Sequence, residues 1–369
     1  MIKILFVTEA LQRNSGVASV VLSYMKFIDR TIFDVELLTY NNGDKDIIDE
    51  ITMLGIRVYY MPELSICNII EFRKALKVFF DQHKYDIVHS HFNQIDCILF
   101  DIAHKSGVTT CISHSHNSKL SDNAVKSIRN RILCFPIKYE ADLWAACSVP
   151  AGKCLYGNKF EKSKKSFIIR NGVDCDKYSF DLMTRQKVRK ELGYTDDDIV
   201  IGHVGGFRTQ KNHTRLISIM DLLVKQNPKY KLVMIGDGEL KNNIEELVNQ
   251  KQLIRNVKFL GTKSNINEYM NGFDLFILPS LYEGLPVVAI EAQTNGLNCI
   301  MSDSITMEAN LTKCIFVSLS DEDEAWCKAI QTAPKGHNPN YLNMVRSAGF
   351  DMRDASNLMQ EKYIEMRNL

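Results

Sequence analysis

The sequence predicts an α/β protein made of two doubly wound domains in tandem. Short, continuous apolar runs alternate along its 369 residues with longer segments of helical periodicity, a pattern typical of parallel strands covered by helices on both faces. The first predicted strand, residues 2–8, and the strand that opens the second half, residues 199–204, both lead into glycine-containing turns. A chain of this length is too long for one ordinary core, so the repeated pattern predicts two Rossmann-like domains.

The predicted strands follow one another with helical segments between them. In the first half they cover residues 2–8, 33–40, 56–60, 86–90, 108–113, 143–148 and 167–170, and in the second half residues 199–204, 231–235, 257–260, 275–278, 297–301 and 315–318. The turn signal Asn171-Gly172 closes the first set, and we place the domain boundary near residue 178, with a linking helix after it. The expected domains are residues 1–178 and 179–349.

The last twenty residues, 350–369, predict a terminal amphipathic helix. Their apolar positions recur at helical spacing and are Leu358, Met359, Tyr363 and Met366.

Composition narrows the class of protein. Hydrophobic residues make up 45% and charged residues 24%, the balance of a globular enzyme rather than a disordered chain. The net charge of +1 gives no reason to expect a nucleic-acid partner. Ten cysteines occur without a CxxC pair, which favours reduced thiols in a cytoplasmic protein. The apolar run near the N-terminus covers only residues 4–7, so we expect neither a signal peptide nor a membrane span.

The most informative segment, residues 274–296, reads DLFILPSLYEGLPVVAIEAQTNG. It predicts a strand, a short loop and a helix that begins at Leu285 or Pro286, because proline is favoured at the first helical position. A helix N-terminus offers unpaired N–H groups and the positive end of a dipole, which together suit a diphosphate. Gly284 leaves room for such a ligand to approach.

Two carboxylates flank this predicted anion site. Glu283 precedes it and Glu291 lies one to two turns inside the helix. Phosphate would repel both, so we expect them to bind the hydroxyl groups of a sugar and of a ribose. The spacing alone equally fits an ordinary acid at a helix N-terminus and a solvated helix residue.

A second strand-to-helix connection carries positive charge. Residues 203–217, HVGGFRTQKNHTRLI, place Gly205 and Gly206 in a turn and Arg208 and Lys211 directly after it. Cations at the end of a strand are well placed to neutralise a leaving diphosphate.

The first half offers glycine and histidine at the ends of strands. Gly16 follows the first strand, and VHSHFN and CISHSHNS contribute His89, His91, His114 and His116. A single histidine there is usually structural, but four on two strands favour a functional wall that contacts sugar. A metal site is the alternative, and it lacks an evident carboxylate ligand.

These motifs resemble the family 4 retaining glycosyltransferases of GT-B fold, which include many bacterial exopolysaccharide, capsule and lipopolysaccharide transferases. Glu283, seven residues and Glu291 match the family's E-x7-E motif in its SxxEGLPxxxxEA setting, and NGVD (171–174), QKNH (210–213) and IGDGEL (235–240) occur in the expected order. The resemblance covers nearly the whole chain. It implies two Rossmann-like domains that face each other across a cleft, with the C-terminal helix returning to the first domain.

The resemblance also implies roles for the donor side of the site. Glu283 is expected to contact the donor sugar and Glu291 the ribose. Leu285, with the backbone around Gly284 and Pro286, is expected to meet the phosphates.

Cations and the first domain complete the implied site. Arg208 and Lys211 are expected to hold the diphosphate, and Gly16 to face it from the other side. One histidine of the pair His114 and His116 is expected near the reacting sugar, and the motifs do not choose between them.

Two glycines of the second half bear on donor recognition. The family usually has arginine where this chain has Gly206, and Arg208 is the candidate replacement. The loop at Gly261 is expected to meet the base through its backbone.

The resemblance implies transfer of a sugar, with retention, from a nucleoside-diphosphate donor, most simply a UDP-sugar. The acceptor would be lipid-linked or a saccharide in cell-surface polysaccharide biosynthesis. No cofactor or metal is expected, because the acidic run at 196–198 precedes a strand on the linker side. The alternatives are a sugar-nucleotide epimerase of the same fold and a donor-binding subunit without activity, the latter motivated by Gly206.

A basic segment, residues 119–138, suggests contact with a membrane. It carries five basic residues against one acid and has apolar residues at helical spacing, Val125, Ile128 and Ile132. Such a helix can lie on an anionic membrane or pack its apolar stripe on the core. We expect a peripheral protein at the inner face of the cell membrane.

Overall fold

The computed structural model describes residues 1–12, 15–40, 43–117 and 124–367. Contacts divide the chain into two compact units, residues 173–351 and the remainder. The chain leaves the first unit after Gly172 and returns to it at Met352. The predicted boundary near residue 178 and the helix after it thus fall inside the second unit.

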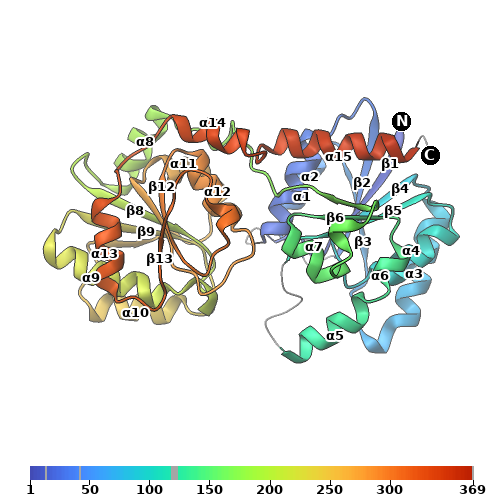
Figure 1. Cartoon of the computed structure of the whole chain (residues 1–369), viewed down its shortest axis with the longest axis horizontal. Helices are drawn as coiled ribbons and strands as arrows, with labels where there is room; N and C mark the ends of the chain where they lie inside the picture. The colour runs from blue at the N-terminus through green and yellow to red at the C-terminus, as the bar shows by residue number, and fades with distance from the viewer. Residues whose placement is uncertain (13–14, 41–42, 118–123, 368–369) are drawn as a thin grey trace. The chain divides into compact units, whose positions relative to one another are not determined.

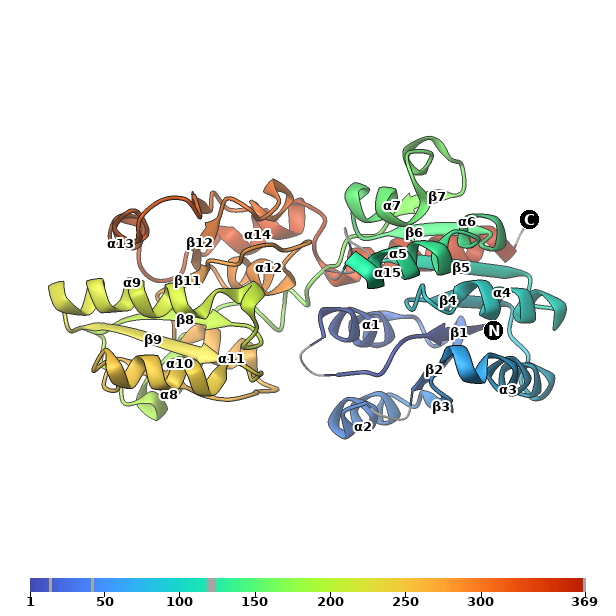
Figure 2. The ribbon, with the colours of Figure 1, turned by 90° about the horizontal axis from the view of Figure 1, so that it is seen from below.

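The first unit is built on a seven-stranded sheet in the order β3-β2-β1-β4-β5-β6-β7, and each pair of neighbours is parallel (Figure 2). The strands are β1 (Ile2–Val7), β2 (Phe33–Tyr40), β3 (Arg57–Met61), β4 (Ile87–Ser90), β5 (Thr110–Ser115), β6 (Leu143–Ala146) and β7 (Ser166–Ile168). The helices are α1 (Gly16–Phe27), α2 (Lys45–Met53), α3 (Ile69–Gln82), α4 (Asp96–Lys105), α5 (Ala124–Cys134), α6 (Ile137–Glu140), α7 (Val149–Tyr156) and α15 (Met352–Arg367), with short 3-10 helices η1 (Ile66–Asn68) and η2 (Phe160–Lys162).

The second unit has a six-stranded parallel sheet in the order β10-β9-β8-β11-β12-β13 (Figure 1). Its strands are β8 (Ile199–Val204), β9 (Tyr230–Ile235), β10 (Val257–Phe259), β11 (Leu275–Leu278), β12 (Asn298–Ser302) and β13 (Ile315–Val317). Its helices are α8 (Leu182–Leu192), α9 (His213–Gln226), α10 (Lys241–Gln250), α11 (Ile266–Asn271), α12 (Val287–Thr294), α13 (Asp323–Thr332) and α14 (Asn340–Ser347), with η3 (Thr209–Lys211) and η4 (Met307–Ala309).

Both faces of the second sheet are buried, which explains the continuous apolar runs. In β9, Leu232 and Met234 join one hydrophobic cluster with α9, α10 and α13, whereas Val233 and Ile235 join another with α8, α11 and α12. Alternate side chains therefore enter different cores, as in other doubly wound sheets. The predicted fold class is confirmed, and every predicted strand is present with its ends moved by at most two residues.

Each sheet has a point where the strand order reverses, between β1 and β4 in the first unit and between β8 and β11 in the second. In open parallel sheets, ligands bind beyond the carboxyl ends of the strands at these points. The loops after β8 and β11 carry Arg208, Lys211 and Glu283, whereas the four histidines lie on or directly after β4 and β5. The predicted site residues thus follow strands at or next to the switch points.

The start of one helix differs from the prediction. Helix α12 begins at Val287, because Pro286 has an extended ψ of 98° and occupies the N-cap rather than the first helical position. Leu285 belongs to the loop before it. Gly16 is the first residue of α1, with Ser15 as the N-cap.

The C-terminal helix α15 packs on the first unit, as predicted. The backbone N–H of Asp29 donates to Gln360 Oε1 at 2.7 Å, and the Tyr363 ring contacts Phe33 edge-on. Leu358 was expected on the buried face and is instead exposed, because Ala355, Met359 and Tyr363 form that face. Across the described ranges, no helix is long and apolar enough to span a bilayer.

Candidate active site

Glu283 and Lys211 form an ion pair between the loops after β11 and β8. Lys211 Nζ lies 2.6 Å from Glu283 Oε1, and both side chains are largely buried. Ser280 Oγ donates to the same oxygen at 2.7 Å, and Gln210 Nε2 donates to Oε2 at 3.2 Å. These contacts fix the carboxylate, whose role the sequence predicts, beside the cation predicted to hold phosphate.

Main-chain contacts hold the two loops together. The backbone N–H of Leu281 donates to Gln210 O at 2.8 Å, and Asn212 Nδ2 donates to Pro279 O at 3.2 Å. Asn212 adopts a left-handed φ of 55°, which ends η3 and starts α9. The distance between Lys211 and Glu283 is therefore set by the loops and not by the ion pair alone.

Glycines allow the strand ends of the second unit to approach closely. A Cβ on Gly236 would lie 2.2 Å from Gly205 O, and Gly236 has a φ of 144° that side chains rarely adopt. Gly205 in turn faces the Lys211 side chain, whose Cε would lie 3.0 Å from an added Cβ. The N–H of Gly236 donates to Gly261 O at 2.9 Å, which brings the loop at Gly261 to the same edge.

Arg208 lies beside Gly206. A Cβ added to Gly206 would lie 3.8 Å from Arg208 Nε, and Arg208 is exposed. The guanidinium of Arg208 therefore lies close to the position from which the side chain of an arginine at residue 206 would extend.

The N-terminus of α12 follows Glu283 along the chain. Gly284 is exposed, Leu285 is half-buried and Pro286 is buried. Among the residues described, no side chain caps α12. Its first N–H groups remain available to an anion.

Glu291 lies inside α12 and is buried, so it is not the solvated helix residue that its position also allowed. Its carboxylate hydrogen-bonds the side chain of Tyr178. Burial raises the pKa of Glu291 to about 7, and the Tyr178 hydrogen bond and the charge of Lys177 oppose that rise. Tyr178 was not predicted, because it lies far from Glu291 in the sequence.

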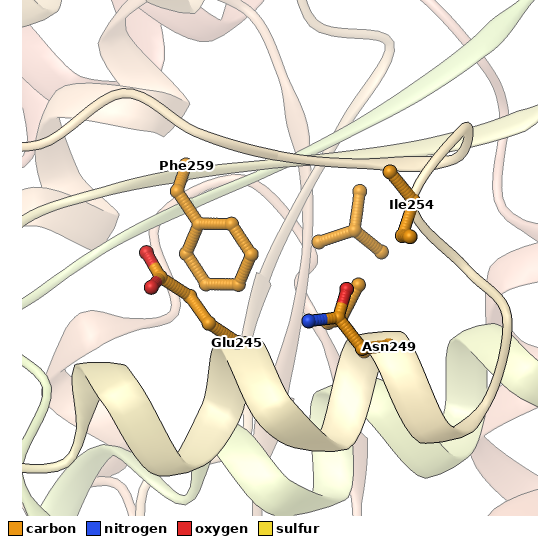
Figure 3. A pocket seen from close by; sticks show the side chains of 6 residues that line it. Glu245, Asn249, Ile254 and Phe259 are labelled. Carbon is orange, nitrogen blue, oxygen red and sulfur yellow. The ribbon is translucent and has the colours of Figure 1, made fainter.

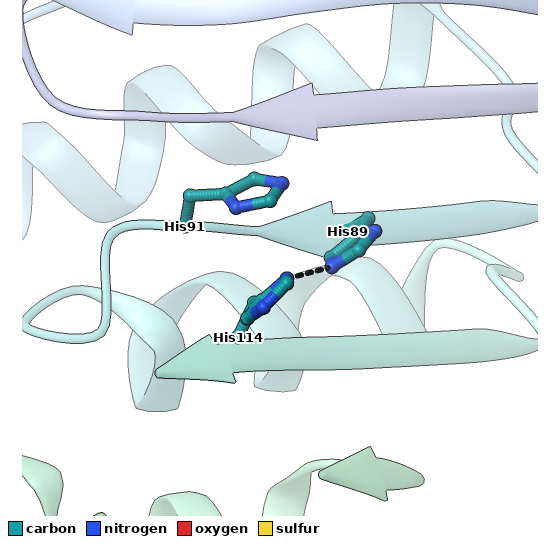
Figure 4. A group of neighbouring side chains, drawn as sticks. All are labelled: His89, His91 and His114. Atoms are coloured by element: carbon teal, nitrogen blue, oxygen red, sulfur yellow. Dashed lines mark hydrogen bonds between the residues drawn. The ribbon is translucent and has the colours of Figure 1, made fainter. Parts of the chain in front are cut away.

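Four histidines of the first unit form one buried stack: His89, His91 and His114, which Figure 4 shows, and His116. The ring centroids of His114 and His116 are 4.3 Å apart, and those of His89 and His91 are 4.5 Å apart. His89 Nε2 lies 3.2 Å from His114 Nδ1, and His91 Nδ1 lies 2.7 Å from His116 Nε2. Burial lowers the pKa of all four rings, that of His116 to about 4, so the rings are neutral at pH 7.

The ends of the stack are held by other residues of this unit. Tyr363 Oη lies 2.5 Å from His89 Nδ1, and Asn171 Oδ1 lies 3.1 Å from His116 Nδ1. The structure brings the four predicted histidines together and buries them, His116 the least completely. Gly16 is exposed, and an added Cβ there would meet nothing within 4 Å, so its position does not require glycine.

A separate small pocket lies between α10 and β10, where Glu245, Asn249, Ile254 and Phe259 line it (Figure 3). The predicted site residues do not line it. Its mainly apolar walls lack the cations that a diphosphate requires.

Comparisons with known proteins agree with the fold and the motifs. A family model described as "Glycosyl transferases group 1" matches residues 184–313. A relative named "Putative glycosyltransferase EpsF" from Bacillus subtilis (strain 168) is 32% identical over 345 residues, covering 91% of this chain and 89% of the relative. A "UDP-Gal:alpha-D-GlcNAc-diphosphoundecaprenol alpha-1,3-galactosyltransferase" from Escherichia coli is 28% identical over 309 residues, covering 78% and 76%.

Solved structures share the fold at lower identity. Anabaena HepE in complex with UDP and glucose aligns with a TM-score of 0.81 at 17% identity, over 99% of this chain and 100% of that one. A glycosyltransferase involved in lipopolysaccharide biosynthesis, WaaG, aligns with a TM-score of 0.68 at 14% identity, over 97% and 99%. These structural similarities show the fold, and the 32% identity to EpsF over 91% of this chain shows the family. The chain belongs to the group 1 glycosyltransferases of GT-B fold.

Proposed function

We propose that this glycosyltransferase moves a sugar, with retention, from a UDP-sugar to a lipid-linked or saccharide acceptor in cell-surface polysaccharide biosynthesis. The observation that carries the proposal is the Lys211–Glu283 pair at the switch point of the second sheet. A cation and a fixed carboxylate at one strand edge match the two halves of a nucleotide-sugar, its diphosphate and its hydroxyl groups. Two relatives support the polysaccharide context by name: the diphosphoundecaprenol galactosyltransferase, and a "Capsular polysaccharide biosynthesis glycosyltransferase CapH" from Staphylococcus aureus that is 24% identical over 376 residues.

The donor is proposed to bind along the strand ends of the second unit. Lys211 and Arg208 would meet the diphosphate, together with the free N–H groups at the start of α12. Glu283 would accept hydrogen bonds from the sugar and Glu291 from the ribose. Backbone groups at Gly261 would meet the base.

Retention is proposed to follow from internal return. Lys211 and Arg208 stabilise the charge that develops on the leaving diphosphate, and a phosphate oxygen takes the acceptor proton on the face that the leaving group vacates. The leaving group needs two positive charges, which these side chains supply, so the transfer step is proposed to be independent of metal. Of the two candidate histidines, we assign the sugar contact to His116, since it follows the end of β5 and keeps some exposure, whereas His114 has none.

The test is a panel of UDP-, GDP- and ADP-sugars assayed for nucleoside-diphosphate release and for transfer. We expect release with a UDP-sugar, transfer to a lipid-linked acceptor, and the product's anomeric configuration to match that of the donor by NMR. Glu283→Gln should lower kcat by at least about 100-fold through loss of an interaction aimed at the reacting sugar. Glu246→Gln, on the exposed face of α10, is the control.

Other outcomes separate the alternatives. An epimerised free sugar without acceptor would identify an epimerase. Binding of UDP-sugars without release in the presence of saccharide and lipid-linked acceptors would identify a donor-binding subunit. Normal turnover of the Glu283 variant would overturn the assignment of that residue.

We propose, further, that the first unit contacts an anionic membrane through a patch on α5 and α6. Its exposed members are Ile132, Phe135 and Tyr139, with Arg129, Arg131 and Lys138 beside them. Lys138 Nζ lies 3.9 Å from the centroid of the Phe135 ring, so positive charge and apolar surface occur together. Anionic lipid headgroups complement this combination. The predicted residues 119–123 lie outside the described ranges, as do the side chains of Val125, Lys126 and Ile128.

Vesicle co-sedimentation tests this contact. Wild-type protein should bind vesicles that contain phosphatidylglycerol more strongly than neutral vesicles, and Phe135→Glu should weaken that binding. Met53→Glu changes an even more exposed apolar residue of the same unit, on α2, and should have no effect. Equal binding by both variants would remove the patch from the proposal. The cellular location that we propose is the cytoplasm, at the inner face of the membrane, and all ten cysteines are free thiols.

A further inference from the structure

The histidine stack contains more nitrogen lone pairs than the surrounding residues satisfy. One ring nitrogen from each of His89, His91 and His114 lies within 4.8 Å of the other two, and the three rings are buried (Figure 4). His91 Nε2 and His114 Nε2 have no hydrogen-bond partner in the described part of the chain. Buried polar atoms are normally paired, so these nitrogens require an explanation, which the site proposed below supplies for His91 Nε2.

The hydrogen bonds around the stack determine where the protons sit. Asn171 Oδ1 is an acceptor, so His116 carries its proton on Nδ1 and accepts with Nε2. His91 must then donate from Nδ1 to His116 Nε2, which leaves His91 Nε2 as a lone pair. On the other side, the Tyr363 hydroxyl can accept from His89 Nδ1, which leaves His89 Nε2 as a lone pair.

His114 completes the group. Its Nδ1 is 3.2 Å from His89 Nε2. Two nitrogens that bind one tetrahedral metal ion at 2.0–2.1 Å lie roughly 3.3 Å apart. The spacing between His89 and His114 is close to this value, and one ring nitrogen of His91 lies within 4.8 Å of the other two ligand atoms.

We propose that His89, His91 and His114 bind one divalent transition-metal ion of the Zn²⁺ class through one ring nitrogen each. Neutral imidazoles select Zn²⁺, Co²⁺, Ni²⁺ or Cu²⁺ over Mg²⁺ and Ca²⁺, which prefer oxygen. Tyr363 and the His116–Asn171 pair hold the other ring nitrogens of two ligands, as outer partners do in histidine metal sites.

The ion would join β4, β5 and helix α15. His89 is on β4, His114 is on β5, and Tyr363 comes from α15, which follows the whole second unit in the sequence. A bound ion would therefore stabilise the attachment of the C-terminal helix to the first sheet. Neither Lys211 nor Glu283 is among its ligands, and the ion is given no part in the proposed transfer step.

The test uses full-length protein treated with a chelator and then titrated with Co²⁺. We expect one equivalent to bind with the visible spectrum of a nitrogen-coordinated, near-tetrahedral ion, and Zn²⁺ to displace it and raise the Tm. Tyr363→Phe removes only an outer partner and should weaken binding by about 10- to 100-fold. His91→Gln should abolish the spectrum, and His213→Gln, a buried histidine of the second unit, should leave it unchanged.

A second group of possible ligands could also bind the added ion, so the test must distinguish the two groups. His104, Cys111 and Asp142 also lie close enough to share an ion, and that ion would have a sulfur ligand. A thiolate charge-transfer band that is lost in Cys111→Ser would place the ion there and overturn the proposal. Failure of wild-type protein to bind Co²⁺ would overturn it as well, whatever the folding of the His91 variant. Unchanged affinity of Tyr363→Phe for Co²⁺ would show that the Tyr363 hydroxyl does not support the ligand His89.

Discussion

Replacing Glu291 by glutamine should change the pH dependence of stability in a defined direction. Burial raises the folded-state pKa of this carboxyl from 4.5 to about 7. The folded protein therefore holds a proton that the unfolded chain has lost between these two pH values, so stability falls as pH rises through this window. Glutamine keeps the shape of the protonated form and does not ionise.

The magnitude follows from the pKa. A shift of about 2.5 units corresponds to about 3 kcal/mol at 1.36 kcal/mol per unit. Because the unfolded carboxyl is already mostly ionised at pH 5.5, about 2 kcal/mol of this should appear between pH 5.5 and pH 8. Glu291→Gln should thus gain about 2 kcal/mol over wild type across that range, and at pH 8 it should be the more stable protein if its other contacts are kept.

The assay is urea unfolding of both proteins at pH 5.5 and pH 8, with Glu246→Gln as the matched control because Glu246 is exposed on α10. A constant difference between Glu291→Gln and wild type at the two pH values would refute the reasoning. Glu291→Gln should bind the donor more weakly than wild type, although it is the more stable protein at pH 8, since the proposed ribose contact loses a charged acceptor. Isothermal titration with UDP measures that loss.

Three further changes test other parts of the second unit. Lys211→Met should weaken UDP binding by about 10- to 100-fold, the value of a charge-assisted hydrogen bond, and unchanged affinity by isothermal titration would remove Lys211 from the donor site. Gly202→Ala should cost about 1–3 kcal/mol in urea unfolding, because its Cβ would lie 2.0 Å from the Phe273 ring; a neutral result would mean that this ring shifts freely. Asp274→Asn should cost about 3–5 kcal/mol, since it leaves the buried guanidinium of Arg189 without its anion, and a cost near zero by the same method would contradict that pairing.

The sheet could be predicted from the sequence because its strands are buried on both faces. Such strands read as uninterrupted apolar runs, and β2, β8 and β11 have the predicted ends. Strand β5 shows where this signal fails. Its last residues, Ser113, His114 and Ser115, are polar yet buried, because other side chains satisfy them: Ser113 Oγ donates to Asp96 at 2.5 Å, and Ser115 Oγ donates to Ala151 O at 2.8 Å. Because these residues are polar, the sequence did not indicate that the buried strand continues to Ser115.

The start of α12 shows a second limit. Proline is favoured at the first helical position, but its ring fixes φ and leaves ψ free, so it can also stand just before that position. Pro286 takes an extended ψ, which moves the first helical residue to Val287. The loop thereby gains residues between Glu283 and the helix, a difference that composition does not encode.

Residue identities at the site were predictable, but most of their partners were not. E-x7-E and the basic turn indicated Glu283, Glu291 and Lys211 separately. The pairing of Lys211 with Glu283 joins positions 72 residues apart, and Tyr178 reaches Glu291 from the segment before α8. Such contacts depend on strand order, which periodicity does not supply.

The Lys211–Glu283 pair also explains how a carboxylate is retained beside an anion site. In the protein without donor, each charge satisfies the other, and Ser280 and Gln210 complete the carboxylate's hydrogen bonds. Under the proposed roles, an arriving diphosphate competes for Lys211, while the sugar's hydroxyl groups arrive to occupy Glu283. Neither buried charge is then left unpaired, which would carry a cost of several kcal/mol. A nucleoside diphosphate without its sugar would take the cation and leave the carboxylate uncompensated, so the pair favours the intact donor over the product.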